Sequence, residues 1–288
     1  MKTWDTVAIV GVGLIGGSIG LALRERKLAR EVVGIGRRPG PLRIALRRGA
    51  VTRTTTDLAA GVAEADFVVI CTPVESIAGH VRAAAEASRT ATLITDAGST
   101  KGPIVAELDR ILANGQDSPY PRFVGSHPMA GSEKNGPQHA RGDLFEGCVT
   151  IVTPTDHSNA KACQAVSQFW RKLGARVLRM TPQEHDQAMA AISHLPHVVA
   201  AALAAVTPAE SLPLAAGGWR DTTRIAGGDA ILWRQILSQN RWNVLQALDQ
   251  FLEELSAYRR ALTYDDGDQL EKLLERGRAI RARCKANG

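Results

Sequence analysis

The chain has 288 residues, 44% of them hydrophobic and 22% charged, with a formal net charge of +6 and a pI near 9.4. The length exceeds what one small core needs, so one large or two modest domains are expected. The composition is that of an ordinary globular protein, and no apolar run approaches the roughly 20 residues of a transmembrane helix. The N-terminus lacks the pattern of a signal peptide, so we expect a cytoplasmic protein without membrane contact.

The basic charge fits either nucleic acid or a small polyanionic substrate. Aromatic residues make up only 5% of the chain, so no stacking platform accompanies the charge, and no nucleic-acid partner is expected. The four cysteines are scattered without the spacing of metal ligands, so no metal is predicted.

The first 180 residues alternate short β-rich runs with helical stretches. The predicted strands are 6–10, 31–36, 66–72, 91–96, 122–126, 148–153 and 175–180. The predicted helices are 16–28, 40–48, 75–87, 101–113 and 159–173. This alternation predicts an α/β fold with a mostly parallel, Rossmann-type sheet covered on both faces.

After Pro182 the pattern contains no convincing strand. Helical runs are predicted at 184–206, 229–262 and 266–285, and the apolar run 184–206 is expected to be a buried central helix. We therefore predict a dinucleotide-binding domain over 1–182 and an all-helical substrate-binding and dimerisation domain over 183–288.

A glycine-rich turn follows the first strand and opens the first helix, which is the context that a dinucleotide site requires. Gly11 permits the tight turn, Gly13 lets the backbone approach a pyrophosphate, and Gly16 lets helix and strand pack closely. Leu14 and Ile15, at the start of the helix, are assigned to the same site because free backbone N–H groups bind phosphate there.

The end of the second strand distinguishes NADP from NAD. An acidic residue there would bind the ribose 2′-hydroxyl of NAD, but the chain has Gly36 followed by Arg37 and Arg38. Guanidinium groups can accept a 2′-phosphate, so NADP is the expected cofactor, with NAD possible. The alternative is that both arginines are simply solvated.

Three motifs fall where further strands end: CTP at 71–73, DAGSTK at 96–101 and GSHPMAG at 125–131. Ligands bind at that edge of open α/β sheets, and we assign Thr72 and Pro73 to the cofactor site. Together with SHLPH at 193–197 and RDTTRIA at 220–226, these motifs resemble the prephenate/arogenate dehydrogenase family of tyrosine biosynthesis. The resemblance implies oxidative decarboxylation of prephenate or arogenate, with hydride transfer to the nicotinamide.

The resemblance also implies roles for single residues. His127 matches the catalytic histidine, and an imidazole suits removal of the hydroxyl proton. Ser99 matches a serine that hydrogen-bonds both this histidine and the substrate hydroxyl, and Ser126 is assigned to the substrate site. His194 matches a histidine near the nicotinamide and substrate.

Two further residues complete the expected substrate site. His197 lies one turn after His194 on the same helix face. Arg224 matches the arginine that binds a substrate carboxylate, for which a two-point guanidinium contact is suited. The two substrates differ only in a keto or amino group, and His197 slightly favours the keto acid, prephenate.

Two alternatives remain open from the sequence. One is another hydroxyacid-type dehydrogenase with a helical second domain, although the 183–206 helix lacks the catalytic lysine usual there. The other is a basic nucleotide-sensing or nucleic-acid-binding protein without turnover, which predicts salt-dependent DNA binding. A homodimer built from the apolar helices is expected as the assembly.

Overall fold

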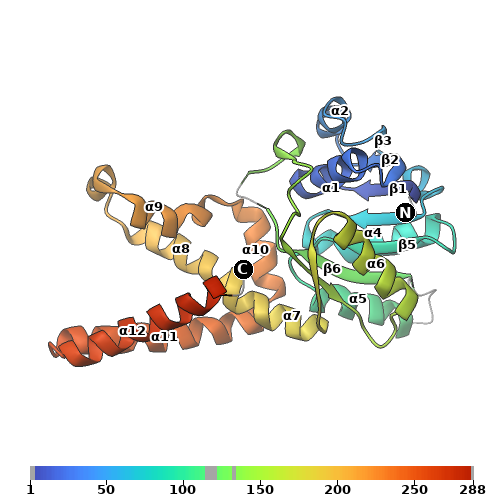
Figure 1. Ribbon diagram of the computed structural model, residues 1–288. Coiled ribbons are helices and arrows are strands. Elements are labelled where there is room, and N and C mark those ends of the chain that lie inside the picture. The colour runs from blue at the N-terminus through green and yellow to red at the C-terminus, as the bar shows by residue number, and fades with distance from the viewer. Residues whose placement is uncertain (1–3, 114–121, 132–133, 287–288) are drawn as a thin grey trace. The chain divides into compact units, whose positions relative to one another are not determined.

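The structure is a computed structural model that describes residues 4–113, 122–131 and 134–286 (Figure 1). The chain divides into two compact units, residues 1–241 and 242–288. Each unit is described by itself below.

The first unit is built on a single eight-stranded sheet (Figure 1). Its strands are β1 (Trp4–Val10), β2 (Ala29–Ile35), β3 (Arg53–Thr55), β4 (Phe67–Ile70), β5 (Leu93–Asp96), β6 (Phe123–Pro128), β7 (Val149–Thr153) and β8 (Arg176–Arg179). Their order is β3-β2-β1-β4-β5-β6-β7-β8, and every neighbouring pair is parallel except β6 with β7. The expectation of a mostly parallel Rossmann-type sheet is confirmed.

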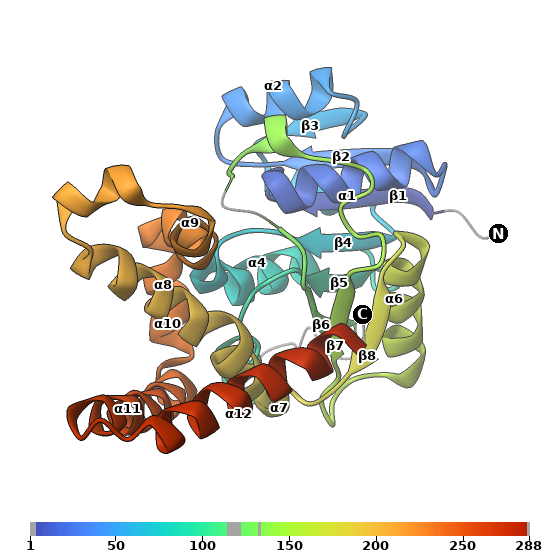
Figure 2. The same cartoon turned by 60° about the vertical axis from the view of Figure 1, so that its left-hand side comes forward.

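Helices cover both faces of this sheet, as Figure 2 shows. The helices between the strands are α1 (Leu14–Glu25), α2 (Pro39–Arg47), α3 (Leu58–Val62), α4 (Val74–Ala87), α5 (Gly102–Ala113) and α6 (Ala160–Lys172), with a short 3₁₀ turn, η1 (Pro137–His139). One core packs α1, α2 and α6 against the sheet, and the other packs α3, α4 and α5 against the opposite face. Alternate residues of β1 enter the two cores, because successive side chains of a strand point to opposite faces.

The sequence did not predict β3 or α3. β3 has three half-buried residues, too few to show an alternating pattern, and α3 has five. α3 is stabilised by its N-cap, since the Asp57 side chain accepts the Ala60 N–H at 3.1 Å.

The helical part of the first unit begins with a nearly continuous helix. Its segments are α7 (Pro182–Met189), the π-helical turn η2 (Ala190–His194) and α8 (Leu195–Val206). The prediction of a buried central helix is wrong for the second half, where only His197 and Ala200 of α8 are buried. Pro182–Val206 is also long and apolar enough to cross a membrane, which was not expected from the sequence. One such helix is weak evidence for a membrane span, because core helices of globular proteins share this composition.

The remaining elements of the first unit are η3 (Ala209–Leu214), α9 (Gly217–Thr223), η4 (Arg224–Gly227) and α10 (Ala230–Gln239). The second unit contains most of α11 (Arg241–Thr263) and all of α12 (Gly267–Ala286). The single helix predicted over 229–262 is therefore wrong, because it is broken at Asn240.

Candidate active site

The glycine turn between β1 and α1 has the geometry that its sequence predicts. Gly11 has φ +96°, a conformation that L side chains rarely adopt. A Cβ on Gly16 would lie 2.1 Å from the Gly11 carbonyl oxygen, so only glycine allows this packing. A Cβ on Gly13 would meet nothing within 4 Å, so its backbone faces open space. No side chain caps the N-terminus of α1, which leaves the first backbone N–H groups available to a phosphate.

A cleft of about 780 Å³ opens beside this turn. Its lining includes Gly11, Gly13, Thr72, Pro73 and both Arg37 and Arg38. The two arginines are exposed, and Gly36 at the end of β2 presents no carboxylate. The residues present therefore fit a dinucleotide, and the expected cofactor residues lie together in the first unit.

The cleft also contains His80 of α4, which the sequence reading did not single out. Its Nδ1 lies 3.0 Å from Thr72 Oγ1. Burial lowers the pKa of His80, and the positive charge of Arg37 lowers it further. His80 is therefore neutral at pH 7 in the free protein.

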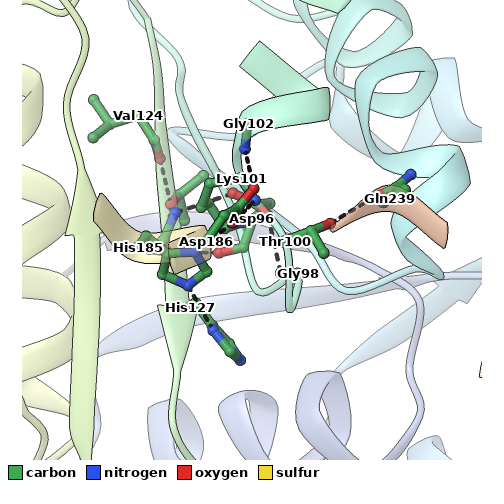
Figure 3. Close-up of polar contacts among 12 residues, drawn as sticks. Asp96, Gly98, Thr100, Lys101, Gly102, Val124, His127, His185, Asp186 and Gln239 are labelled. Carbon is green, nitrogen blue, oxygen red and sulfur yellow. Dashed lines mark hydrogen bonds and ion pairs between the residues drawn. The ribbon is translucent and has the colours of Figure 1, made fainter. Parts of the chain in front are cut away.

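The histidine motif places His127 near the end of β6, at the same sheet edge as the glycine turn, because β1, β4, β5 and β6 run parallel. His127 keeps only 8% of its surface exposed. Its Nδ1 lies 2.9 Å from His185 Nε2 on α7 (Figure 3). Burial lowers the pKa of His127 well below 6.5, and charge on His185, Lys101 or His194 would lower it further.

Asp186 connects α7 to the start of α5. Its Oδ1 accepts the Lys101 N–H and its Oδ2 accepts the Gly102 N–H, each at 2.8 Å (Figure 3). The same Oδ1 lies 2.7 Å from Nδ1 of His185. The carboxylate therefore fixes the neighbour of His127 relative to the sheet.

A buried ion pair lies beneath this network. The Lys101 ammonium contacts the Asp96 carboxylate at the end of β5, and both side chains are almost fully buried. Asp96 Oδ1 also accepts the Ser126 N–H at 3.0 Å, and Oδ2 accepts the Gly98 N–H at 2.9 Å. These bonds order the loop between β5 and α5.

His194, on the π-helical turn, is fully buried. Its Nδ1 lies 3.0 Å from Asn240 Nδ2, which also donates to the Asp186 carbonyl at 2.6 Å. Because an amide nitrogen can only donate, His194 Nδ1 accepts and Nε2 carries the proton. That Nε2–H is buried without a partner in the part of the chain that the structure describes. Burial is the largest cause that lowers the pKa of His194 to about 4.

His197 stacks on the indole of Trp233, with 3.6 Å between ring centroids and 12° between planes. Its Nδ1 is also buried without a partner among the described residues. A Cβ on Gly228 would lie 3.1 Å from His197 and 2.7 Å from the Trp233 indole nitrogen. Glycine at position 228 therefore leaves room for His197 to stack on Trp233.

Neither of the two serines assigned to the site makes a side-chain hydrogen bond to His127 among the described residues. Ser99 is half-buried, and among the described residues its side chain makes no hydrogen bond to His127, whose one such partner is His185. Ser126 is fully buried on the opposite face of β6 from His127, since neighbouring residues of a strand alternate. Its hydroxyl accepts the Trp170 indole N–H at 2.8 Å and donates to the Asp96 carbonyl at 2.6 Å. The predicted substrate contact of Ser126 is not supported by this position.

Arg224 lies at the start of η4 and is exposed. η4 packs against α8, the helix that carries His197. A positive charge on His194 would lower the pKa of His127 further. No group of three or more His, Cys, Asp or Glu side chains within the described ranges could hold a metal ion.

His185 and Lys101 lie in motifs that the sequence shows, HD at 185–186 and DAGSTK at 96–101, but neither they nor Asn240 had an assigned role. His185 stands beside Asp186 directly after the capping box of Thr181 and Glu184, which fixes the start of α7. The capping box and the adjacent histidine and aspartate were the indication in the sequence that α7 begins with polar side chains.

The fold and the site define the class of protein. A Rossmann-type sheet with a glycine turn, a dinucleotide-sized cleft and a buried histidine at the same edge is typical of a nucleotide-dependent dehydrogenase with a helical second region.

Comparison with known proteins identifies the family. Residues 19–179 match the nucleotide-binding domain of prephenate dehydrogenase, and residues 181–276 match the prephenate dehydrogenase dimerization domain. The chain therefore belongs to the prephenate dehydrogenase family, which confirms the resemblance predicted from the motifs and makes the chain an oxidoreductase.

Several relatives support this assignment. The chain is 37% identical to prephenate dehydrogenase of Bacillus subtilis over 92% of this chain and 72% of the relative. It is 31% identical to cyclohexadienyl dehydrogenase of Zymomonas mobilis over 100% of this chain and 98% of the relative. A crystal structure of prephenate dehydrogenase from A. aeolicus with hydroxyphenyl propionate and NAD+ superposes with a TM-score of 0.87 and 31% identity, covering 97% of this chain and 98% of the other.

Proposed function

We propose that the protein catalyses the oxidative decarboxylation of prephenate, arogenate or both, with transfer of hydride to a nicotinamide dinucleotide. The carrying observation is the neutral, buried His127 at the same sheet edge as the dinucleotide turn. When bound, the nicotinamide accepts the hydride from the carbinol carbon.

His127 acts as the general base. Its Nδ1 is occupied by His185, which leaves Nε2 to take the proton of the substrate hydroxyl as the hydride departs. Loss of CO2 then makes the ring aromatic, and the proton held at Nε2 returns to the phenolic oxygen. His127 therefore stores one proton during turnover, and the net reaction releases none. Ser99 remains a candidate to hydrogen-bond the same substrate hydroxyl.

The other histidines and Arg224 recognise the substrate. His194 offers a buried Nε2–H donor to a substrate oxygen, because no protein group among the described residues satisfies it. His197, fixed by its stack on Trp233, presents a second unpartnered nitrogen. Arg224 binds a substrate carboxylate by its two-pronged guanidinium. We keep the sequence-based expectation that the keto acid, prephenate, is the preferred substrate.

We infer that NADP is the preferred cofactor and NAD the weaker one. Gly36 leaves room at the end of β2, and exposed Arg37 and Arg38 line the cleft where a 2′-phosphate would lie. Gly11, Gly13 and the N–H groups of Leu14 and Ile15 would hold the pyrophosphate, and Gly16 lets α1 pack closely on the turn. Thr72 and Pro73 would line the same cleft.

We infer that the protein is cytoplasmic and forms a homodimer through its helical region. The part that binds the nucleotide would end, and the part that forms the dimer would begin, near residue 182. Large apolar side chains are exposed along the helices of the single chain, including Val206 at 75%, Leu214 at 84% and Ile231 at 68%. Exposed apolar surface on this scale indicates an interface. Light scattering of the purified protein tests the assembly, and a monomeric mass at micromolar concentration would contradict it.

The function is tested by a spectrophotometric assay that crosses prephenate and arogenate with NAD+ and NADP+. We expect formation of reduced cofactor with at least one pair, and the highest kcat/KM with prephenate and NADP+. Absence of turnover with all four pairs would contradict the proposed reaction. Higher kcat/KM with NAD+ would contradict only the cofactor preference.

A further inference from the structure

Three side chains form a hydrogen-bonded row from the sheet edge into the helical part of the first unit. His127 Nδ1 lies 2.9 Å from His185 Nε2, and His185 Nδ1 lies 2.7 Å from Asp186 Oδ1 (Figure 3). His185 has no exposed surface and Asp186 is 4% exposed. Water therefore has little access to the row, and each donor must find its acceptor within it.

The positions of the protons follow from Asp186. Both of its carboxylate oxygens accept backbone N–H groups, from Lys101 and Gly102, so the side chain is acceptor-only. His185 Nδ1 must then carry a proton and donate it to Asp186. Since burial keeps the pKa of His185 below its usual value, the ring is neutral and its Nε2 is an acceptor. His127 must therefore donate from Nδ1.

We propose that His185, held by Asp186, is a positioning residue that fixes the Nδ1–H tautomer of His127 and so keeps the lone pair of Nε2 free for the substrate proton. When His127 takes that proton, both ring nitrogens donate. The new positive charge then lies at one end of a row whose other end is the Asp186 carboxylate. The role of His185 rests on the proposed function of His127 as the base.

The charged and titratable groups around the row come from four elements. Asp186 follows His185 on α7, Lys101 precedes α5, Asp96 ends β5, and His194 lies on η2. Lys101 is paired with Asp96, so its charge is partly balanced. Asp186 is thus the carboxylate in direct contact with His185.

The direct test reads the tautomer rather than the activity. The protein is labelled with ¹⁵N at its seven histidine rings, and His127 is assigned by comparison with the His127→Asn variant. We expect Nδ1 of His127 in the wild type to show the shift of a protonated ring nitrogen and Nε2 that of an unprotonated one. In His185→Leu, Nδ1 of His127 loses its acceptor, and the Nδ1–H form should no longer predominate. A wild-type His127 protonated at Nε2 would overturn the proposal, whether or not the protein turns over any substrate.

Activity provides the second readout. Asp186→Asn is expected to lower kcat about 10- to 100-fold, because an amide has one oxygen and cannot accept from the Lys101 N–H, the Gly102 N–H and His185 together, so His185 is held less well. His185→Leu removes the acceptor and should cost about 100-fold, whereas His185→Gln keeps an oxygen acceptor for His127 and should stay within about tenfold of wild type. KM and the cofactor Kd should change less than about threefold in all three.

Glu184→Gln is the matched control, because Glu184 is exposed, lies on the same helix and keeps its cap as a glutamine. It should leave both tautomer and kcat unchanged. The positioning role is wrong if His185→Leu and His185→Gln lower kcat equally. It is also wrong if neither variant lowers kcat while His127→Asn is inactive, and in both cases His127 remains the proposed base. If His127→Asn retains full activity, the proposed base is wrong instead.

Discussion

The Gly102 main chain and the Asp186 carboxylate are in close contact although 84 residues separate them. The Gly102 N–H donates to Asp186 Oδ2 at 2.8 Å, and a Cβ on Gly102 would lie 3.0 Å from the same oxygen. Asp186 in turn contacts His185, the neighbour of His127. The position of the proposed base therefore depends on a glycine at the start of α5.

Replacement of Gly102 by alanine should disturb this arrangement without unfolding the protein. The added methyl group forces Asp186 to move by a few tenths of an ångström, and we expect kcat to fall between about two- and tenfold, since geometric errors of this size cost part of the orientation effect. Gly40→Ala is the control, because a Cβ there meets nothing within 4 Å. Equal kcat values for Gly102→Ala and Gly40→Ala would contradict the dependence of the His127 position on Gly102.

His127→Ala should lower kcat by a factor of about 100 or more, because a general base typically contributes 10²–10⁴-fold. Cofactor affinity, measured by fluorescence titration, should stay nearly unchanged, since His127 does not line the dinucleotide cleft. A variant with near-wild-type kcat would remove His127 from the chemistry.

Arg37→Ala should weaken NADP+ more than NAD+. The expected difference is about 1.5–3 kcal/mol if the guanidinium makes a charge-assisted contact to the 2′-phosphate. Arg43, which is exposed on α2 but does not line the cleft, provides the control variant Arg43→Ala. Titration of both cofactors measures the difference, and equal weakening of NAD+ and NADP+ would show that Arg37 does not read the phosphate.

Arg224→Ala should raise KM for prephenate about tenfold or more, with a smaller effect on kcat. A carboxylate contact away from the hydride binds ground and transition states about equally. Arg224→Lys should rescue only partly, because an ammonium cannot reproduce the two-point contact. Arg220→Ala, on the neighbouring α9, is the comparison: a larger KM effect there than at Arg224 would move the carboxylate contact to Arg220.

The free energy of unfolding should fall as the pH is lowered from 7 to 5. His194 has a folded pKa of about 4 against 6.5 in an unfolded chain. Between these values the unfolded chain binds a proton that the folded chain does not, so acid favours unfolding. His194 alone should account for about 2 kcal/mol over this range.

Urea unfolding at the two pH values measures this loss. His194→Gln should reduce the difference between pH 7 and pH 5, whereas the control His139→Gln, at an exposed histidine, should not. If the two variants lose stability to the same extent over this range, burial of His194 is not the cause.

Local features of the site could be predicted from the sequence, and contacts between distant segments could not. The glycine spacing after β1 was sufficient because its reasons are local: Gly11 has a positive φ, and Gly16 packs against the carbonyl oxygen of Gly11. The pairing of His127 with His185 joins residues 58 positions apart, and Asn240 reaches back 54 positions to Asp186. Neither pair leaves a periodic signal.

The orientation of Ser126 depended on where a strand ends. The predicted strand ended at Ser126, whereas β6 continues to Pro128, so Ser126 and His127 are neighbours within the strand and face opposite ways. The hydroxyl of Ser126 instead binds Trp170 of α6 behind the strand.

The antiparallel pairing of β6 with β7 has a consequence for how this enzyme can vary. A parallel strand would require a crossover along one face of the sheet, whereas the reversed β7 lets the chain return at the edge where β6 ends. Asn135, Gly136 and Pro137 of this return segment line the dinucleotide cleft without belonging to any strand. A change of length in this segment would alter the wall of the cofactor cleft while the register of every strand is preserved.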